Sequence, residues 1–179
     1  MEKRIFLIGF MGSGKSFLGR AMASEWAIPF VDLDHFIENT GGGHFSIAKI
    51  FETHGEAFFR TLEAQQLEKI INDFKTILLA TGGGTPCFHE NMALMNQQGI
   101  TIYLRTPPDL LVERLLQTSE LDKRPLLRHK NQAALLDFVL QKLNERQSFY
   151  ESAQIIIDQK DNDLEKTITA IETELGKLF

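Results

Sequence analysis

Residues 9–16, GFMGSGKS, follow directly after the apolar run RIFLI and contain three glycines, a lysine and a serine. The segment fits the pattern G-x-x-x-x-G-K-[ST], in which glycines let successive backbone N–H groups point into one concavity. A helix that begins there adds its positive N-terminal end. The pattern therefore predicts a loop that holds the phosphates of a nucleoside triphosphate, and not merely a glycine turn. Within it, we expect Lys15 to reach the β- and γ-phosphates and the Ser16 hydroxyl to coordinate Mg²⁺.

Two acidic residues follow the second apolar run of the chain, in the segment VDLD at residues 31–34. We expect Asp32 and Asp34 just beyond the carboxyl end of a strand, the edge at which open parallel sheets bind ligands. Because the two are separated by one residue, one can turn toward a metal ion and the other toward a second substrate. Asp34 would serve equally well as the N-cap of a helix that starts at His35.

A third candidate is the segment LLATGGGT, which places Gly82, Gly83 and Gly84 at the end of another predicted strand. One glycine there would indicate a turn, whereas three indicate that a ligand lies against bare backbone. Among the arginines, Arg60 lies beside Phe58 and Phe59 and is placed to point inward from a helix.

Arg146, in LNERQSFY, fits a surface position as well as a binding site. Arg124 lies in the polar, proline-interrupted segment 118–132, where a basic residue on a flap could close over phosphates.

The elements that must position these residues alternate along the chain. Apolar runs predict strands, and amphipathic patterns between them predict helices. This alternation predicts a parallel sheet with helices on both faces, and continuously apolar strands agree with burial on both sides. The predicted strands are 4–10, 29–34, 76–84, 100–106 and 153–158, and the predicted helices are 15–26, 55–74, 89–98, 107–117, 131–153 and 161–179. The glycine-rich segment 40–46 is predicted to be a loop.

Composition sets outer bounds on the function. A chain of 179 residues is expected to form one domain, and its net charge of −5 gives no general attraction to nucleic acid or to anionic membranes. The single cysteine, Cys87, excludes an internal disulfide and is expected to be a small packing residue. The short apolar start resembles neither a signal sequence nor a membrane span. We therefore expect a cytoplasmic protein and a monomer.

At this point the sequence resembles the shikimate kinase family. The segments GFMGSGKS, DLD, TG…SIAKIF, GEAFFRTLE, TGGG and RPLL occur in the order and at about the spacings of that family. The phosphate loop alone is shared with many enzymes, and the combination of segments is far more specific. The resemblance implies transfer of the γ-phosphate of ATP to the 3-hydroxyl of shikimate, on the route to chorismate and the aromatic amino acids. It also implies an α/β fold of the nucleoside monophosphate kinase type, a five-stranded parallel sheet in the order 2-3-1-4-5 with a mobile lid.

The resemblance also implies roles for individual residues, with ATP and shikimate as the partners and Mg²⁺ as the cofactor. Asp34 is the candidate base and binds the shikimate hydroxyls, while Asp32 holds Mg²⁺ through water beside Ser16. Arg124 is the lid arginine, in a lid at about 118–132, and the substrate-binding helices span about 34–62. The implied ATP-binding residues are Gly12, Ser13, Gly14, Lys15, Ser16, Phe17 and Arg124. The implied catalytic residues are Lys15, Asp34 and Arg124, and the implied shikimate-binding residues are Asp34, Arg60, Gly83, Gly84 and Arg146.

The sequence departs from the family pattern at two places. The segment TGGGHFSIAKIF carries two extra residues, and Lys49 stands where an acid is common. After the last predicted strand, IDQKDNDLEK lacks the arginine and proline that the family often places near adenine. Arg114 either stacks on the base or lies at an exposed helix position.

Three other functions fit these residues less well. A gluconate kinase shares the loop and the fold, but DLD with G-E-x-x-F-R and TGGG favours shikimate. A guanine nucleotide switch should carry N-K-x-D, which does not occur. A metal site built on histidines fails on the spacing of His35, His44, His54, His89 and His129.

Overall fold

A five-stranded parallel sheet forms the centre of the computed structural model, which describes residues 3–41, 45–117 and 131–178. The strand order is β2-β3-β1-β4-β5, with all neighbours parallel, and it confirms the predicted topology. The strands are β1 (Lys3–Ile8), β2 (Phe30–Asp32), β3 (Thr76–Ala80), β4 (Ile100–Arg105) and β5 (Ile155–Asp158). Connections between parallel neighbours run through helices that cover both faces.

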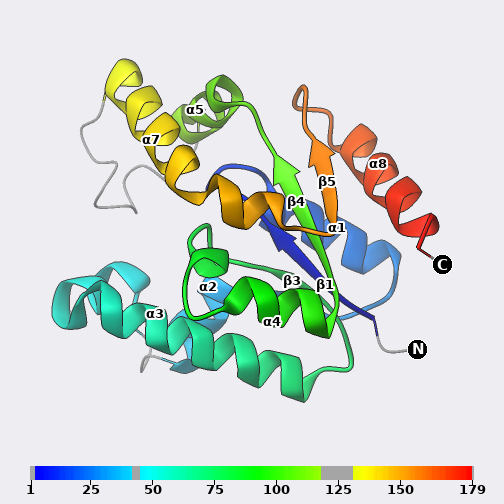
Figure 1. Cartoon of the computed structure of the whole chain (residues 1–179), viewed down its shortest axis with the longest axis horizontal. Helices are drawn as coiled ribbons and strands as arrows, with labels where there is room; N and C mark the ends of the chain where they lie inside the picture. The colour runs from blue at the N-terminus through cyan, green and yellow to red at the C-terminus, as the bar shows by residue number, and fades with distance from the viewer. Residues whose placement is uncertain (1–2, 42–44, 118–130, 179) are drawn as a thin grey trace.

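Alternating side chains of β1 supply both halves of the core. Ile5 and Leu7 pack with helices α1 (Lys15–Glu25) and α8 (Leu164–Gly176) on one face. Phe6 and Ile8 pack with α3 (Ile47–Asp73) and α4 (Asn91–Gln98) on the other, as Figure 1 shows. Because neither face meets water, the strand is apolar at successive positions, as the sequence predicted.

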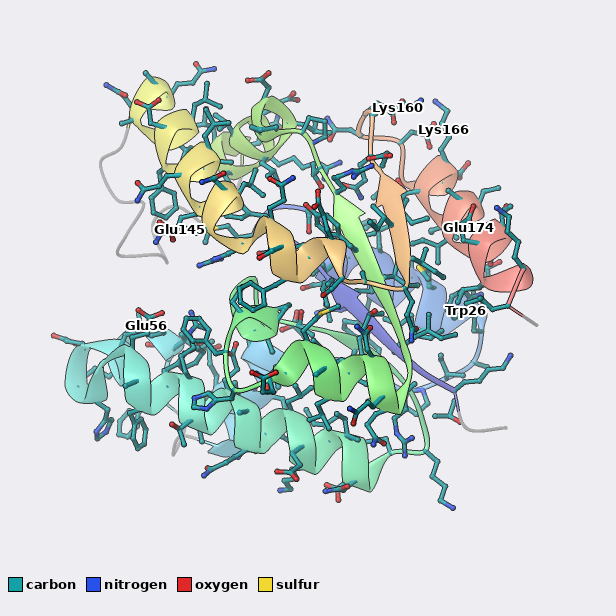
Figure 2. The ribbon with its side chains drawn as sticks, viewed as in Figure 1. Trp26, Glu56, Glu145, Lys160, Lys166 and Glu174 are labelled. Atoms are coloured by element: carbon teal, nitrogen blue, oxygen red, sulfur yellow. The ribbon has the colours of Figure 1, made fainter. Side chains whose placement is uncertain are left out.

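The pair α1 and α8 is also joined at its outer edge. Trp26, the residue that ends α1, donates a hydrogen bond from Nε1 to Glu172 Oε1 of α8 at 3.0 Å. Figure 2 shows Trp26 facing the last turns of α8. Ile171 and Leu175 of α8 belong to the same apolar cluster as Leu18 of α1. Helix α1 is thus packed against α8 and joined to it by a hydrogen bond at its C-terminal end.

Helices α5 (Pro108–Gln117) and α7 (Gln132–Glu151) form a separate pair above the phosphate loop. Their shared cluster includes Leu111, Leu115 and Val139, and Phe10 of the loop belongs to it. Asn131 begins α7 as its N-cap by accepting a hydrogen bond from the Ala134 N–H at 2.8 Å. Within the three described ranges, no helix has the length and apolarity that crossing a membrane requires.

Local structure differs from the prediction at the ends of several elements and in one predicted loop. The predicted helix 55–74 begins earlier, at Ile47 of α3, where Ser46 caps it, and Gly55 interrupts its regular path with φ 80°. Thr40, expected in a loop, belongs to a π-helical turn, η1 (Ile37–Gly41), and its hydroxyl donates to the Phe36 carbonyl at 2.6 Å. The first strand ends at Ile8, two residues early, because Gly9 turns the backbone with φ 143°.

Candidate active site

The phosphate loop depends on glycine at three points. Gly9, Gly12 and Gly14 have φ values of 143°, 82° and 90°, which side chains of L-residues rarely tolerate. A Cβ at Gly9 would also lie 2.9 Å from the Leu104 carbonyl oxygen. The loop can therefore curl tightly between β1 and α1, as the motif predicted.

Lys15 extends back along the inner side of this loop. Its Nζ donates to the carbonyl oxygens of Gly9 and Phe10, both at 2.9 Å, and the residue is 8% exposed. The ammonium group thus lies within the loop that would receive the phosphates. Phe17, in the first turn of α1, is 65% exposed.

Asp32 joins the phosphate loop to the second half of the site. Its Oδ2 accepts a hydrogen bond from the Ser16 hydroxyl, and its Oδ1 accepts one from the His35 N–H at 3.2 Å. Asp32 is therefore the N-cap of α2 (Leu33–Phe36), and Asp34, which the sequence allowed as a cap, lies inside the first turn. A hydroxyl and a carboxylate held side by side are the hard oxygen ligands that a divalent cation needs.

The glycine triplet after β3 is where three of the predicted substrate residues meet. A Cβ at Gly82 would lie 2.7 Å from Asp34 Oδ1, one at Gly83 3.5 Å from Arg146 Nη1, and one at Gly84 2.6 Å from Arg60 Nη2. None of the three glycines has a positive φ, so a side chain there would be limited by neighbouring atoms, most closely at Gly82 and Gly84, and not by backbone conformation. The ligand that the sequence predicts against this backbone stays a prediction, and the structure shows that these three side chains lie beside it.

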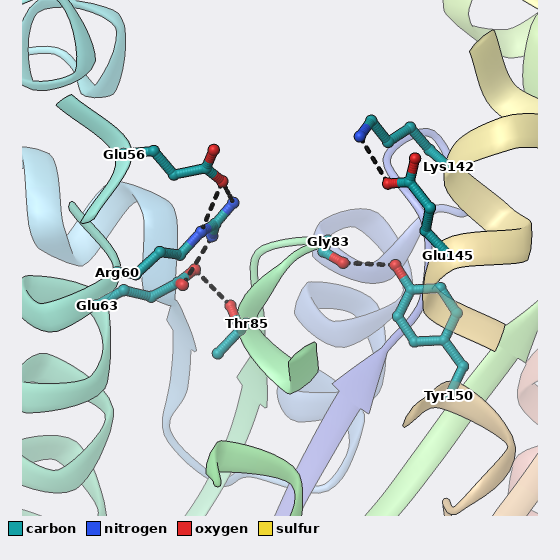
Figure 3. Close-up of polar contacts among 8 residues, drawn as sticks. All are labelled: Glu56, Arg60, Glu63, Gly83, Thr85, Lys142, Glu145 and Tyr150. Carbon is teal, nitrogen blue, oxygen red and sulfur yellow. Dashed lines mark hydrogen bonds and ion pairs between the residues drawn. The ribbon is translucent and has the colours of Figure 1, made fainter. Parts of the chain in front are cut away.

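Arg60, on α3, is almost fully buried and is held by two carboxylates. Its Nη1 donates to Glu63 Oε2 at 2.8 Å, while Nε and Nη2 both donate to Glu56 Oε1 at 3.2 Å. The fully buried Glu63 also accepts from the Thr85 hydroxyl at 2.6 Å, as Figure 3 shows. The guanidinium lies 4.5 Å from the Phe88 ring centroid, which adds a cation–π contact.

The inward position expected for Arg60 therefore agrees with the structure. Because Glu63 is paired with both Arg60 and Thr85, its burial leaves no uncompensated charge.

Arg146 approaches the triplet from the opposite side, on α7. It is half-buried, with its guanidinium 5.7 Å from the Phe10 ring centroid. One turn later, the Tyr150 hydroxyl donates a hydrogen bond to the Gly83 carbonyl. Burial raises the pKa of the nearby Cys87 thiol, and the charges of Arg146 and Arg60 oppose that shift. Two arginines from different helices thus approach one small region.

Arg114 of α5 is hydrogen-bonded to two other parts of the chain. Its Nη1 donates to the Gly12 carbonyl at 3.3 Å and to Gln159 Oε1 at 2.9 Å, and its Nε donates to Asn162 Oδ1 at 2.8 Å. Arg114 therefore joins the phosphate loop to the segment after β5. Arg124 and most of the predicted lid fall at 118–130, outside the described residues.

Three residues of this site were not assigned a role from the sequence: Glu63, Thr85 and Tyr150. Glu63 stands three residues after Arg60, a spacing that places opposite charges together on a helix, so a pairing rule could have found it. Tyr150 stands four residues after Arg146 and could have been placed on the same helix face. Thr85 carries no such signal, since its partner Glu63 is distant in sequence.

Comparison with known proteins agrees with this geometry. The model of the family described as shikimate kinase matches residues 11–175. A shikimate kinase of Bacteroides thetaiotaomicron is 42% identical over 155 residues, which cover 87% of this chain and 86% of that protein.

The fold of the chain also matches solved structures of shikimate kinases. The crystal structure of a shikimate kinase from Bacteroides thetaiotaomicron has a TM-score of 0.88 at 36% identity, covering 97% of this chain and 98% of that one. A shikimate kinase from Acinetobacter baumannii, in complex with shikimate, has a TM-score of 0.84 at 33% identity, covering 98% and 93%. A gluconokinase from Sinorhizobium meliloti, with a TM-score of 0.65 at 17% identity, covering 99% and 93%, shares the fold alone. The chain therefore belongs to the shikimate kinase family, enzymes that use ATP to phosphorylate shikimate in aromatic biosynthesis.

Proposed function

We propose that the chain transfers the γ-phosphoryl group of ATP to the 3-hydroxyl of shikimate, with the phosphate loop and the glycine triplet as the two halves of the site. One observation carries this proposal: the two halves touch. A Cβ at Gly83 would lie 3.3 Å from the Met11 N–H nitrogen of the phosphate loop and 3.5 Å from Arg146 Nη1. Donor phosphates and an acceptor bound at the triplet would therefore be neighbours, which phosphoryl transfer requires.

In the nucleotide half, the curled backbone at 9–16 and the N-terminal end of α1 would receive the phosphates. Kinases that use ATP need a divalent cation, and we assign Mg²⁺, with Ser16 as a direct ligand and Asp32 acting through water. The pairing of these two side chains supports that assignment. The cation would neutralise phosphate charge, and Lys15 would stabilise the charge that develops during transfer.

In the acceptor half, Arg60 and Arg146 would bind the shikimate carboxylate, because a planar guanidinium donates two parallel hydrogen bonds to a carboxylate. Asp34, which lies against Gly82, would accept hydrogen bonds from the hydroxyls and act as the base. Gly83 and Gly84 would contribute backbone contacts. The closure role assigned to Arg124 stays a prediction.

Every group in this scheme comes from one chain. We therefore propose a single catalytic domain over residues 1–179 that works as a monomer in the cytoplasm, with the acceptor bound mainly by the helices between 34 and 62. Size-exclusion chromatography coupled to light scattering would measure the mass in solution, and a dimer would contradict this part of the proposal.

The test of the proposed function is ADP release, coupled to a reporter enzyme, with shikimate, quinate, gluconate and nucleoside monophosphates offered one at a time with ATP. We expect turnover that depends on shikimate, with a product phosphorylated at the 3-position as read by ³¹P and proton NMR. Turnover with gluconate alone would favour the second candidate, a gluconate kinase. ATP hydrolysis that no acceptor stimulates would contradict the kinase assignment.

A further inference from the structure

Tyr150 lies in the core beneath the proposed carboxylate site, and its hydroxyl contacts the glycine triplet. It is fully buried on α7, and its hydroxyl donates a hydrogen bond to the Gly83 carbonyl, as Figure 3 shows. Its ring stacks on Tyr103 of β4, with centroids 5.0 Å apart. The ring is therefore immobilised by packing, and its hydroxyl reaches out of the core to a loop of the active site.

Gly83 and Arg146 are the two groups that this phenol links. Tyr150 and Arg146 are one helical turn apart, so they share a face of α7. The same face meets the glycine triplet, where a Cβ at Gly83 would lie 3.5 Å from Arg146 Nη1. Nothing in the α7 backbone alone fixes how far Gly83 stands from the helix, because Gly83 belongs to the segment after β3. The hydroxyl of Tyr150 supplies that connection.

The protonation of Tyr150 suits a permanent donor. Burial raises the pKa of the phenol above its usual range, and the positive charge of Arg146 opposes that shift only in part. The hydroxyl therefore keeps its proton across the physiological pH range and donates to Gly83 throughout.

We propose that Tyr150 is a positioning residue for acceptor binding: its hydroxyl holds Gly83 at a fixed distance from Arg146, so that one backbone group and one guanidinium meet the same carboxylate. This proposal rests on the proposed function, because it takes Arg146 and Gly83 as carboxylate-binding groups. Tyr150 touches neither substrate. Its removal changes the acceptor half of the site and leaves the phosphate loop unchanged.

The test is Tyr150→Phe, which removes one oxygen and keeps the ring. The loss of a buried neutral hydrogen bond predicts a rise in the KM for shikimate of about three- to tenfold, with the KM for ATP within about twofold of the parent. Tyr103→Phe is the matched control, because Tyr103 is 4% exposed, stacks on the same ring and belongs to the same apolar cluster. It should leave both KM values within about twofold.

A double-mutant cycle separates positioning from general packing. In an Arg146→Lys background, Tyr150→Phe should raise the KM for shikimate by clearly less than it does in the parent, since the guanidinium that it orients is gone. Methyl shikimate, which lacks the carboxylate charge, should likewise show a smaller penalty from Tyr150→Phe than shikimate does.

Two outcomes would overturn the inference. One is a Tyr150→Phe variant whose KM for shikimate matches that of Tyr103→Phe, whatever its melting temperature. The other is an equal rise in the KM values for ATP and shikimate, which would indicate loosened packing. If the parent protein shows no shikimate-dependent ADP release, the proposed function fails first, so the two failures are distinguishable.

Discussion

The guanidinium of Arg60 occupies the space that a side chain at Gly84 would need. A Cβ at Gly84 would lie 2.6 Å from Nη2 and 2.8 Å from both Cζ and Nη1 of that arginine. The φ of Gly84 is −96°, a value open to any residue, so a side chain at residue 84 would meet the Arg60 guanidinium and would not strain the backbone. The guanidinium of Arg60 can occupy its present position because residue 84 has no side chain.

Gly84→Ala should therefore displace Arg60 without unfolding the chain. We expect the KM for shikimate to rise by about tenfold or more, because a charge-assisted hydrogen bond to the carboxylate is lost, and the KM for ATP to change little. Steady-state kinetics would measure both. Gly176→Ala is the control, since a Cβ there meets nothing within 4 Å. An unchanged KM for shikimate in Gly84→Ala would show that Arg60 does not bind the acceptor.

Lys15→Ala should lower kcat by at least about 100-fold, because Lys15 would stabilise charge on the transferring phosphoryl group. Circular dichroism should show an unchanged fold, since the lysine donates hydrogen bonds to the Gly9 and Phe10 carbonyls and to the Ser13 hydroxyl, all within the phosphate loop. Lys142→Ala, which removes an exposed lysine paired with Glu145, is the control and should retain full activity. Near-normal turnover by a folded Lys15→Ala protein would refute the phosphate-loop assignment.

Arg60→Ala should raise the KM for shikimate by about tenfold to a hundredfold, equivalent to about 1.5–3 kcal/mol, with a weak effect on ATP. The structure adds a cost in stability, because among the described residues the fully buried Glu63 would keep only the Thr85 hydroxyl as a partner. Arg60→Lys keeps the charge and is the sharper variant: its melting temperature should fall less, while its KM for shikimate still rises. Equal effects on both substrates would indicate general damage.

Glu56→Gln should lower the KM for shikimate by about two- to fivefold. The Glu56 carboxylate accepts from Nε and Nη2 of Arg60, the edge of the guanidinium that suits a second carboxylate, and its side chain is 58% exposed. An exposed ion pair of this kind contributes only about 0.2–1 kcal/mol, so losing it should cost little stability. Glu52→Gln, one turn earlier and paired with Lys49, is the control. A higher KM in Glu56→Gln would show that this glutamate orients Arg60 instead.

The Cys87 thiol should react slowly with iodoacetamide at pH 7.5. Burial raises its pKa above the ordinary value of 9.0, so the folded protein holds less thiolate at any given pH than an unfolded chain does. Alkylation followed by mass spectrometry across pH 6.5–10 should give a midpoint above 9.0, and urea-unfolded protein should react with a midpoint near that value. Rapid modification of the folded protein at pH 7 would contradict the raised pKa.

The parts of the site that follow from the sequence are those encoded within one short segment. The phosphate loop is read from 9–16 alone, because glycine placement and the helix start are local properties. The strand order followed from the resemblance, and the alternation of Phe6 and Leu7 between the two faces follows from strand geometry.

The parts that could not be read are contacts between segments distant in the chain. Glu63 and Thr85 are separated by 22 residues, and Gly83 and Tyr150 by 67, and no local pattern reports either pair. Whether Asp34 caps a helix depended on where β2 ends, and because β2 ends at Asp32, it is Asp32 that caps α2. For the glycine triplet, the sequence predicted a ligand, and only the fold shows which side chains lie beside it.

The central place of β1 in the sheet has a consequence for the newly synthesised chain. Lys3 pairs in register with Thr76 of β3, and Ile5 pairs with Ile100 of β4, so the strand that leads into the phosphate loop is made well before either of its neighbours. Pairing at such separations forms slowly, because the entropy of closing a long stretch of chain is lost before the strand contacts begin to stabilise the structure. On the ribosome, the nucleotide site would therefore stay unassembled until translation has passed β4, and ATP could assist only the final steps of folding.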